Sequence, residues 1–168
     1  MKNSTITWLL SFFLLASCYK SLAAKPTVKD TTRCVEIDGI VGNASLAKGD
    51  ECLVELICFN SVEESVVLKN GKKRFKLSLK KNAFYTIRMS KKGYITRTII
   101  IDTRIADSEY EGHFFSFETN LLAESETEKL NKDALEQPVA LVYFDPKKDC
   151  FVYDKEYASR LKKELVSK

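Results

Sequence analysis

Short runs in which apolar and polar residues alternate fill most of the chain between residues 34 and 121. A period of two is typical of a β-strand that buries one face, because successive side chains point to opposite sides of a sheet. Turn-forming residues separate these runs at close and regular spacing. The pattern predicts a mainly β chain, a seven-stranded antiparallel β-sandwich whose core needs no covering helix.

The seven expected strands each present one apolar face. They cover residues 34–41, 51–59, 65–69, 73–80, 84–90, 94–102 and 113–121. Between the third and fourth runs, Asn70 and Gly71 favour the type I′ turn of a hairpin, because both central positions of that turn need positive φ. The apolar faces predict these core residues: Cys52, Val54, Leu56, Cys58, Phe75, Leu77, Leu79, Tyr85, Ile87, Met89, Ile95, Ile99 and Ile101.

Residues 122–168 follow a different pattern and predict a C-terminal extension with a loop, a β-hairpin and a helix. The charged stretch 123–137 favours a loop or short helix, and the apolar run 139–144 is expected to pair with residues 150–153. Asp154 is the expected N-cap of the final helix, whose apolar positions recur at helical spacing at Tyr157, Leu161 and Leu165. The extension is a small α+β addition or a cover for one sheet edge.

The first 24 residues are expected to direct export rather than to join the fold. The apolar run over residues 6–16 has the length of a secretory signal core and is short for a membrane-spanning helix. Two interpretations of its processing remain open. Residues 15–18, LASC, resemble the lipoprotein box of bacterial lipoproteins, in which Cys18 is lipidated; alternatively, cleavage follows Ala23 or Ala24.

Both interpretations predict an exported protein. A lipid on Cys18 would anchor it as a cell-envelope lipoprotein, periplasmic or associated with the outer membrane, and simple cleavage would give a soluble periplasmic or secreted protein. Residues 25–33 are polar and without a period, so a tether is expected there.

Lys2 and Lys20 are the only charged residues among the first 24, so the rest carries two positive charges fewer than the +4 of the chain. This near balance argues against nucleic-acid binding.

Four cysteines are disulfide candidates, because an exported chain with an even number of them meets an oxidising environment: Cys34, Cys52, Cys58 and Cys150. Three pairings are open. A hairpin centred near residue 46 would set Cys34 opposite Cys58. Alternation opposes this pairing, since Cys34 shares its face with acidic residues and Cys58 shares its face with apolar ones, although a β-bulge could reconcile them.

No catalytic, cofactor-binding or metal-binding residue is predicted. The sequence has one histidine, no nucleophile elbow, no GxGxxG, no phosphate loop and no close CxxC pair that would favour zinc. His113 opens an aromatic strand and is expected to be structural, because a lone base needs an orienting partner. The chain is therefore not expected to be an enzyme or to need a cofactor.

Basic residues are frequent on the polar faces and turns of the expected strands. Solvated sheet faces are the simplest interpretation, and an anion or glycan site is the alternative. Lys91, Lys92 and Tyr94 are the candidate contacts for such a ligand. The other basic positions in this set are Lys69, Lys72, Lys73, Arg74, Lys76, Lys80, Lys81, Arg88 and Arg97.

Four segments resemble the carboxypeptidase regulatory-like, or transthyretin-like, β-sandwich domain of small exported bacterial proteins: IDGIVGN, ECLVELICF, KNGKKRFKLSL and AFYTIRMSKKGYITRTIIIDT. In that family a Tyr-x-Ile strand precedes a Lys-x-Gly-Tyr turn, here FYTI and KKGY. The resemblance covers residues 34–121 and extends less securely to 138–168. It implies a seven-stranded prealbumin-like sandwich and indicates little about function.

The signal region, the resemblance and the missing catalytic groups together predict a cell-envelope module without enzymatic activity. Such a module would act in adhesion, assembly or scaffolding through contacts with envelope proteins. A carbohydrate- or anion-binding module, with a glycan as one ligand, is the alternative.

Overall fold

The structure is a computed structural model that describes residues 33–42, 50–105 and 112–167. The N-terminal signal region with Cys18 and the expected tether up to residue 32 lie outside these residues. In chain order, the described elements are β1 (Arg33–Gly42), β2 (Glu51–Cys58), β3 (Ser61–Lys69), β4 (Arg74–Lys80), β5 (Phe84–Lys91), β6 (Arg97–Asp102), β7 (His113–Asn120), the 3₁₀ helix η1 (Glu124–Glu126), α1 (Lys132–Glu136), β8 (Ala140–Asp145), β9 (Cys150–Tyr153) and α2 (Lys155–Val166).

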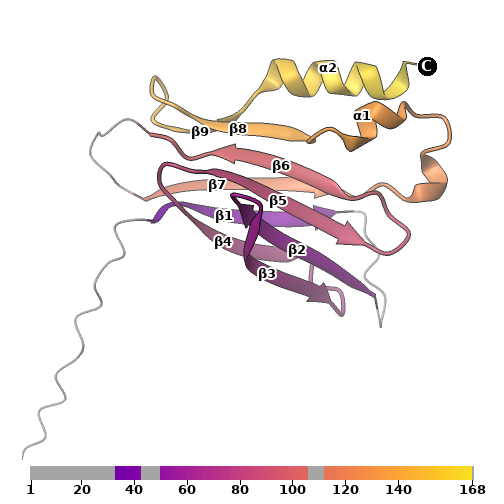
Figure 1. The fold of residues 1–168 in the computed structure, drawn as a ribbon, viewed down its shortest axis with the longest axis horizontal. Coiled ribbons are helices and arrows are strands. Elements are labelled where there is room, and N and C mark those ends of the chain that lie inside the picture. Colours follow the sequence, from indigo (N-terminus) through magenta and orange to yellow (C-terminus); the bar gives the residue numbers. More distant parts are fainter. Residues whose placement is uncertain (1–32, 43–49, 106–111, 168) are drawn as a thin grey trace, which may run out of the picture.

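Two sheets form the body of the molecule (Figure 1). The small sheet has the strand order β4-β1-β7, and the large sheet has the order β3-β2-β5-β6-β8-β9. Side chains from both sheets meet in one hydrophobic core. The prediction of a mainly β chain with a two-sheet core is therefore confirmed.

The sequence predicted wholly antiparallel sheets, and this prediction is wrong for two strand pairs. β1 pairs with β7 in parallel, and β6 pairs with β8 in parallel. Parallel neighbours need a long connection between them. The chain provides it in both cases, because β2 to β6 lie between β1 and β7 in sequence, and β7, η1 and α1 lie between β6 and β8.

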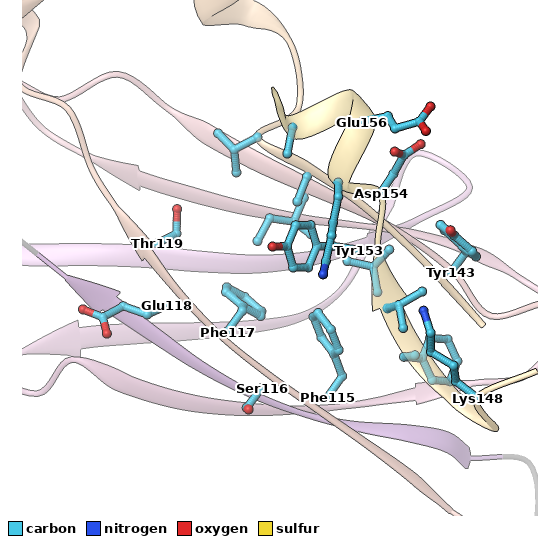
Figure 2. Close-up of a pocket in the computed structure, with 18 residues that line it drawn as sticks. Phe115, Ser116, Phe117, Glu118, Thr119, Tyr143, Lys148, Tyr153, Asp154 and Glu156 are labelled. Carbon is cyan, nitrogen blue, oxygen red and sulfur yellow. The ribbon is translucent and has the colours of Figure 1, made fainter. Parts of the chain in front are cut away.

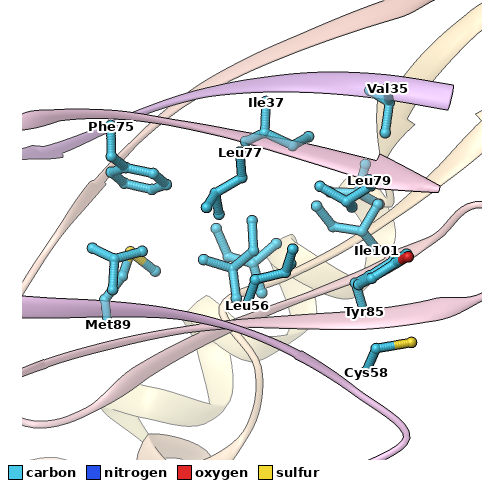
Figure 3. Close-up of a cluster of buried hydrophobic side chains, with 14 of the residues drawn as sticks. Val35, Ile37, Leu56, Cys58, Phe75, Leu77, Leu79, Tyr85, Met89 and Ile101 are labelled. Carbon is cyan, nitrogen blue, oxygen red and sulfur yellow. The ribbon is translucent and has the colours of Figure 1, made fainter. Parts of the chain in front are cut away.

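The core forms between the alternating faces that the sequence predicted. Ile37 of β1 and Leu77 of β4 are paired neighbours in the small sheet, and they face Leu56, Tyr85 and other residues of the large sheet (Figure 3). Every predicted core residue except Ile95 is buried. Ile95 is partly exposed because β6 begins three residues later than expected.

The turn at Asn70 and Gly71 has the expected backbone and an unexpected role. Both residues have positive φ, 56° and 79°, as a type I′ turn requires. The strands on either side do not pair, because β3 belongs to the large sheet and β4 to the small sheet. Most β3 side chains are exposed, whereas β4 buries Phe75 and every second residue after it. The turn therefore carries the chain from one sheet to the other, and the predicted hairpin is wrong.

The C-terminal extension continues the large sheet. β8 adds to β6, and β9 pairs with β8 as the predicted hairpin. The side chain of Asp154 accepts a hydrogen bond from the Tyr157 amide at 2.9 Å and caps α2 as expected. α2 lies beside β8 and β9 (Figure 1), where the Tyr157 hydroxyl donates to the Pro138 carbonyl at 2.7 Å.

Gly39 of β1 makes room for two aromatic rings. It pairs with Phe75 of β4 on one side and with Phe117 of β7 on the other. The two rings meet edge to face with centroids 5.9 Å apart. A Cβ atom at Gly39 would lie 2.2 Å from Cζ of Phe75. The glycine thus lets Phe75 reach across β1, which is a common use of glycine within a strand.

Replacing this glycine should destabilise the sandwich. We expect Gly39→Ala to lower the free energy of unfolding by about 1–3 kcal/mol, the usual cost of overpacking a core, as measured by urea denaturation. The double variant Gly39→Ala with Phe75→Leu should recover part of this loss, because the smaller side chain leaves space for the new methyl group. A Gly39→Ala protein with the wild-type urea midpoint would contradict this packing.

Candidate binding cleft

The unequal width of the two sheets leaves one region of the sandwich open. The small sheet ends at β7, whereas the large sheet continues past β6 with β8 and β9. β7 and β9 are the edge strands on this side and lie close to one another. A cleft of about 1200 Å³ opens between β7, the β8–β9 hairpin and the first turn of α2. This volume exceeds the roughly 300–1,000 Å³ typical of a small-molecule site.

Aromatic and aliphatic side chains line the cleft. Phe115 and Phe117 point into it from β7, while Ser116 and Glu118 project from the other face of the strand and border the cleft (Figure 2). This follows from the period of two in a strand. The apolar lining from the other elements comprises Ile99, Val139, Ala140, Val142, Phe151 and Val152.

An aromatic cluster closes one end of this region. The His113 ring packs against Phe144 and Phe151, with centroids 4.8 and 5.8 Å apart. Phe144 and Phe151 also pack against each other, 5.6 Å apart and nearly perpendicular. The histidine therefore joins β7 to the β8–β9 hairpin, which agrees with the structural role expected for it.

The strand edge along the cleft offers backbone hydrogen-bonding groups. Within the described ranges, β7 pairs with β1 on one side and with no strand on the other. A free strand edge carries N–H and C=O groups that another strand can satisfy. β7 therefore combines an apolar face and an unpaired edge at the same place.

Charges at the rim of the cleft are mixed in sign. Lys148 and Lys155 contribute positive charge, and Glu118, Asp154 and Glu156 contribute negative charge. The Lys148 ammonium lies 3.1 Å from a carboxylate oxygen of Asp145, which holds the pKa of Asp145 below its ordinary value. A balanced rim favours a ligand held by apolar contacts and backbone hydrogen bonds.

The predicted anion or glycan contacts lie away from the cleft, at the turn between β5 and β6. The Lys91 side chain is only 6% exposed, and its Nζ atom lies 3.0 Å from Oδ2 of Asp50. The same Nζ atom is 4.4 Å from the centroid of the Tyr94 ring. Lys91 is thus held within the fold, and Lys92 beside it is exposed.

Several other basic side chains on the sheets are paired with carboxylates. Arg74 donates to both carboxylate oxygens of Asp38 at 2.6 and 2.5 Å, and Arg88 pairs with Glu55 at 2.9 Å. The Asp38 side chain is buried although it lies on the outer face of the small sheet. The hydrogen bonds from Arg74 hold the pKa of Asp38 below its ordinary value of 3.8.

This ion pair should make the stability of the fold depend on pH in the acid range. A carboxyl group whose pKa is lowered by folding stabilises the native state above its unfolded pKa, and this contribution disappears as pH falls through the folded pKa. We expect Asp38→Asn to be less stable than the wild type near pH 6, and the difference to shrink below about pH 4. Urea denaturation of both proteins from pH 2 to 6 measures this. A difference that stays constant over the range would contradict it.

The four disulfide candidates are free thiols in the structure, three of them buried. Cys34 lies in the small sheet and Cys58 in the large sheet, so the hairpin that would pair them across residue 46 is wrong. Cys34 is nevertheless buried in the core rather than placed on the polar face with Glu36, because the register shifts between Arg33 and Val35. Burial raises the pKa of the Cys34 thiol from 9.0 to about 11 and also raises the pKa of Cys52 and Cys58. Thiols in this state are unreactive near neutral pH.

The described ranges contain no group of three or more metal-ligating side chains, and they contain no helix long and apolar enough to cross a membrane. Comparison of the chain with protein-family models, with curated proteins and with solved structures returns no match.

Sequence reasoning missed the cleft and misplaced Arg97. The cleft depends on β8 joining β6, a long-range pairing that alternation within one strand does not encode. Arg97 was placed with the solvated basic residues, but it lies on the inner face of β6 with Ile99 and Ile101, and two of its nitrogen atoms are buried. The signal was present, because Arg97 interrupts the inward series Ile95, Ile99 and Ile101 at a position that should be apolar.

Proposed function

We propose that this chain is a non-enzymatic, exported β-sandwich module of the bacterial cell envelope that acts through protein contacts. In this proposal an extended segment of a partner protein binds in the cleft and adds a strand to the free edge of β7. The observation that carries it is that one edge of β7, beside an apolar cleft, pairs with no strand in residues 33–42, 50–105 and 112–167. Added strands gain affinity from backbone hydrogen bonds and specificity from pockets for alternate side chains.

The sheet dimensions support an added strand in particular. A fourth strand beside β7 would extend the small sheet over β8 and β9, which the small sheet now meets only through β7. Its inward side chains would meet Phe115, Phe117 and the apolar wall formed by Val139 and Ala140. The balanced rim adds no strong preference for a charged partner, so an apolar extended segment is the best match.

The family and the location of the protein are part of the proposal. β1 to β7 form three strands of one sheet and four of the other, an arrangement compatible with a seven-stranded transthyretin-like domain extended by β8, β9 and α2. Export rests on the N-terminal apolar run, with anchoring through Cys18 or cleavage near Ala23 or Ala24.

A carbohydrate ligand is the second candidate. Tyr143 and Tyr153 lie at the rim of the cleft and are 44% and 46% exposed. Exposed aromatic rings with a polar end suit a ligand with one apolar and one wet face. Binding of soluble oligosaccharides, lost when either tyrosine is replaced by alanine, would favour this candidate over the peptide.

Neighbouring residues on β7 provide a matched test of peptide binding. Linear peptides selected from a random library for binding to the full chain should lose about tenfold or more in affinity in Phe115→Ala, as expected when an anchor residue is removed. Phe114→Ala should change affinity by less than about twofold, because Phe114 is 60% exposed on the opposite face of the strand. Isothermal titration calorimetry measures both.

The contact itself should appear in the NMR spectrum of the complex. We expect nuclear Overhauser effects between peptide backbone protons and the amides of β7. Selected peptides that bind equally well to both variants, or that contact β3 or α2 instead, would contradict the proposed function.

A further inference from the structure

Arg97 occupies a position in the interior of the sandwich that should hold an apolar residue. It is the first residue of β6 and shares a face with the buried Ile99 and Ile101. Its antiparallel partner in β5 is Met89, which is fully buried. An arginine at the end of this apolar row is costly, because a charged group loses hydration when it is buried.

Two nitrogen atoms of the Arg97 guanidinium differ from those of other arginines in the part of the chain that the structure describes. Its Nε and Nη1 atoms are buried, and neither has a hydrogen-bond partner in the described part of the chain. By comparison, Arg74, Arg88 and Arg104 each donate to a carboxylate, which belongs to Asp38, Glu55 and Asp102 respectively. Burial lowers the pKa of Arg97, but arginine stays charged in proteins near neutral pH. The charge therefore needs an acceptor.

A small pocket of about 490 Å³ surrounds this group. Leu121, Leu122 and Ala123 form its apolar wall, and Tyr94 and Asn120 add polar atoms. Backbone hydrogen bonds hold this wall in place, since the Ile95 amide donates to the Leu122 carbonyl at 2.8 Å and the Glu124 amide donates to the Gly93 carbonyl at 3.0 Å. The pocket is thus a constructed part of the fold.

Glu126 also lines the pocket, and its carboxylate is the acidic group among the lining residues that could pair with Arg97. Its Oε2 atom instead accepts a hydrogen bond from the Ala123 amide at 3.2 Å, at the start of η1. The Lys91 charge beside Tyr94 is already matched by Asp50. Arg97 is therefore left with two donor atoms that have no partner among the described residues.

We propose that this Arg97 pocket binds a carboxylate that carries a small apolar substituent. A carboxylate bound through two hydrogen bonds takes Nη2 together with either Nε or Nη1 of a guanidinium. Nε and Nη1 have no partner among the described residues and almost no exposed surface, so in this proposal the guanidinium turns toward the pocket when the ligand binds. The leucine wall suits the substituent. The negative charge of Glu126 favours a monoanion over the dianion of phosphate.

Two sources of this carboxylate fit the position of the pocket. Arg97 lies two residues before Ile99 on the same face of β6, and Ile99 lines the cleft beside β7. The C-terminal carboxylate of a peptide lying in the cleft could therefore reach Arg97, and this source rests on the proposed function. A free small organic acid is the other source and does not require peptide binding.

The Arg97 side chain provides a direct spectroscopic readout. In the full chain, the ¹⁵Nε–Hε signal of Arg97, assigned by its loss in Arg97→Met, should shift on addition of sodium propionate and should not shift with sodium chloride at equal ionic strength. A response to propionate supports the free-acid source. A response to a selected cleft peptide with a free C-terminus, absent with its C-terminal amide, supports the peptide source.

Stability measurements separate a ligand site from a structural arginine. Arg97→Met should have a higher melting temperature than the wild type without added acid, because it removes an unpaired buried charge, and its affinity for the carboxylate probe should fall at least about tenfold. Glu126→Gln should bind the probe as well as the wild type or better.

Three outcomes would overturn the proposal. They are no shift of the Arg97 signal with either carboxylate probe, a shift with sodium phosphate as large as that with propionate, or a loss of stability in both Arg97→Met and Glu126→Gln, which would show that these two residues serve each other. If Arg97→Met does not fold, the Arg97 side-chain signal is assigned through bonds from its own backbone amide, and the wild-type NMR titration still decides between binding and its absence. Because the propionate arm uses no peptide, its failure is distinct from a failure of the proposed peptide binding.

Discussion

The unequal width of two sheets that bury each other's apolar faces shapes this molecule. Three strands can cover only part of a six-stranded sheet, so the strands beyond β6 must find other partners. α2 packs beside β8, and the aromatic cluster of His113, Phe144 and Phe151 holds the β8–β9 hairpin against β7. The remaining space is the cleft. The most distinctive surface of the protein is therefore a consequence of strand number.

Ion pairs on the sheets contrast with the unpaired nitrogen atoms of Arg97 among the described residues. On the outer faces, Asp38 and Glu55 neutralise arginines, and Lys91 is matched by Asp50. These pairs neutralise three of the basic side chains on the sheets and their turns. Arg97 differs from them, since it is turned inward and has two donor atoms without an acceptor among the described residues. A buried charge of this kind lowers the stability of the fold, and such residues are expected at functional sites.

Much of the fold could be predicted from the sequence, because alternation is a local property. The inward faces of β2, β4 and β5 were all identified, as was the Asp154 cap. Pairing between distant strands could not be predicted, because it depends on which faces meet in space. For this reason the parallel pairs were missed, and a correctly recognised turn at Asn70 and Gly71 was assigned to a hairpin although it links two sheets.

The candidate site was less predictable than the fold for the same reason. The cleft combines residues from β6, β7, β8, β9 and α2, which meet only after the long-range pairing of β6 with β8. Positive charge in the sequence directed attention to Lys91 and Lys92, whereas burial distinguishes Arg97. A charged residue that breaks an inward apolar series is a better sequence signal than a cluster of surface lysines.

Hydrogen exchange along β7 tests the central claim, that this strand has a free edge, most directly. In a parallel pair, every second amide of a strand points toward its neighbour. In the free protein, NMR should show slow exchange for the alternate β7 amides that face β1 and fast exchange for those between them. Slow exchange at every β7 amide would mean that another strand already occupies this edge, and it would contradict the account.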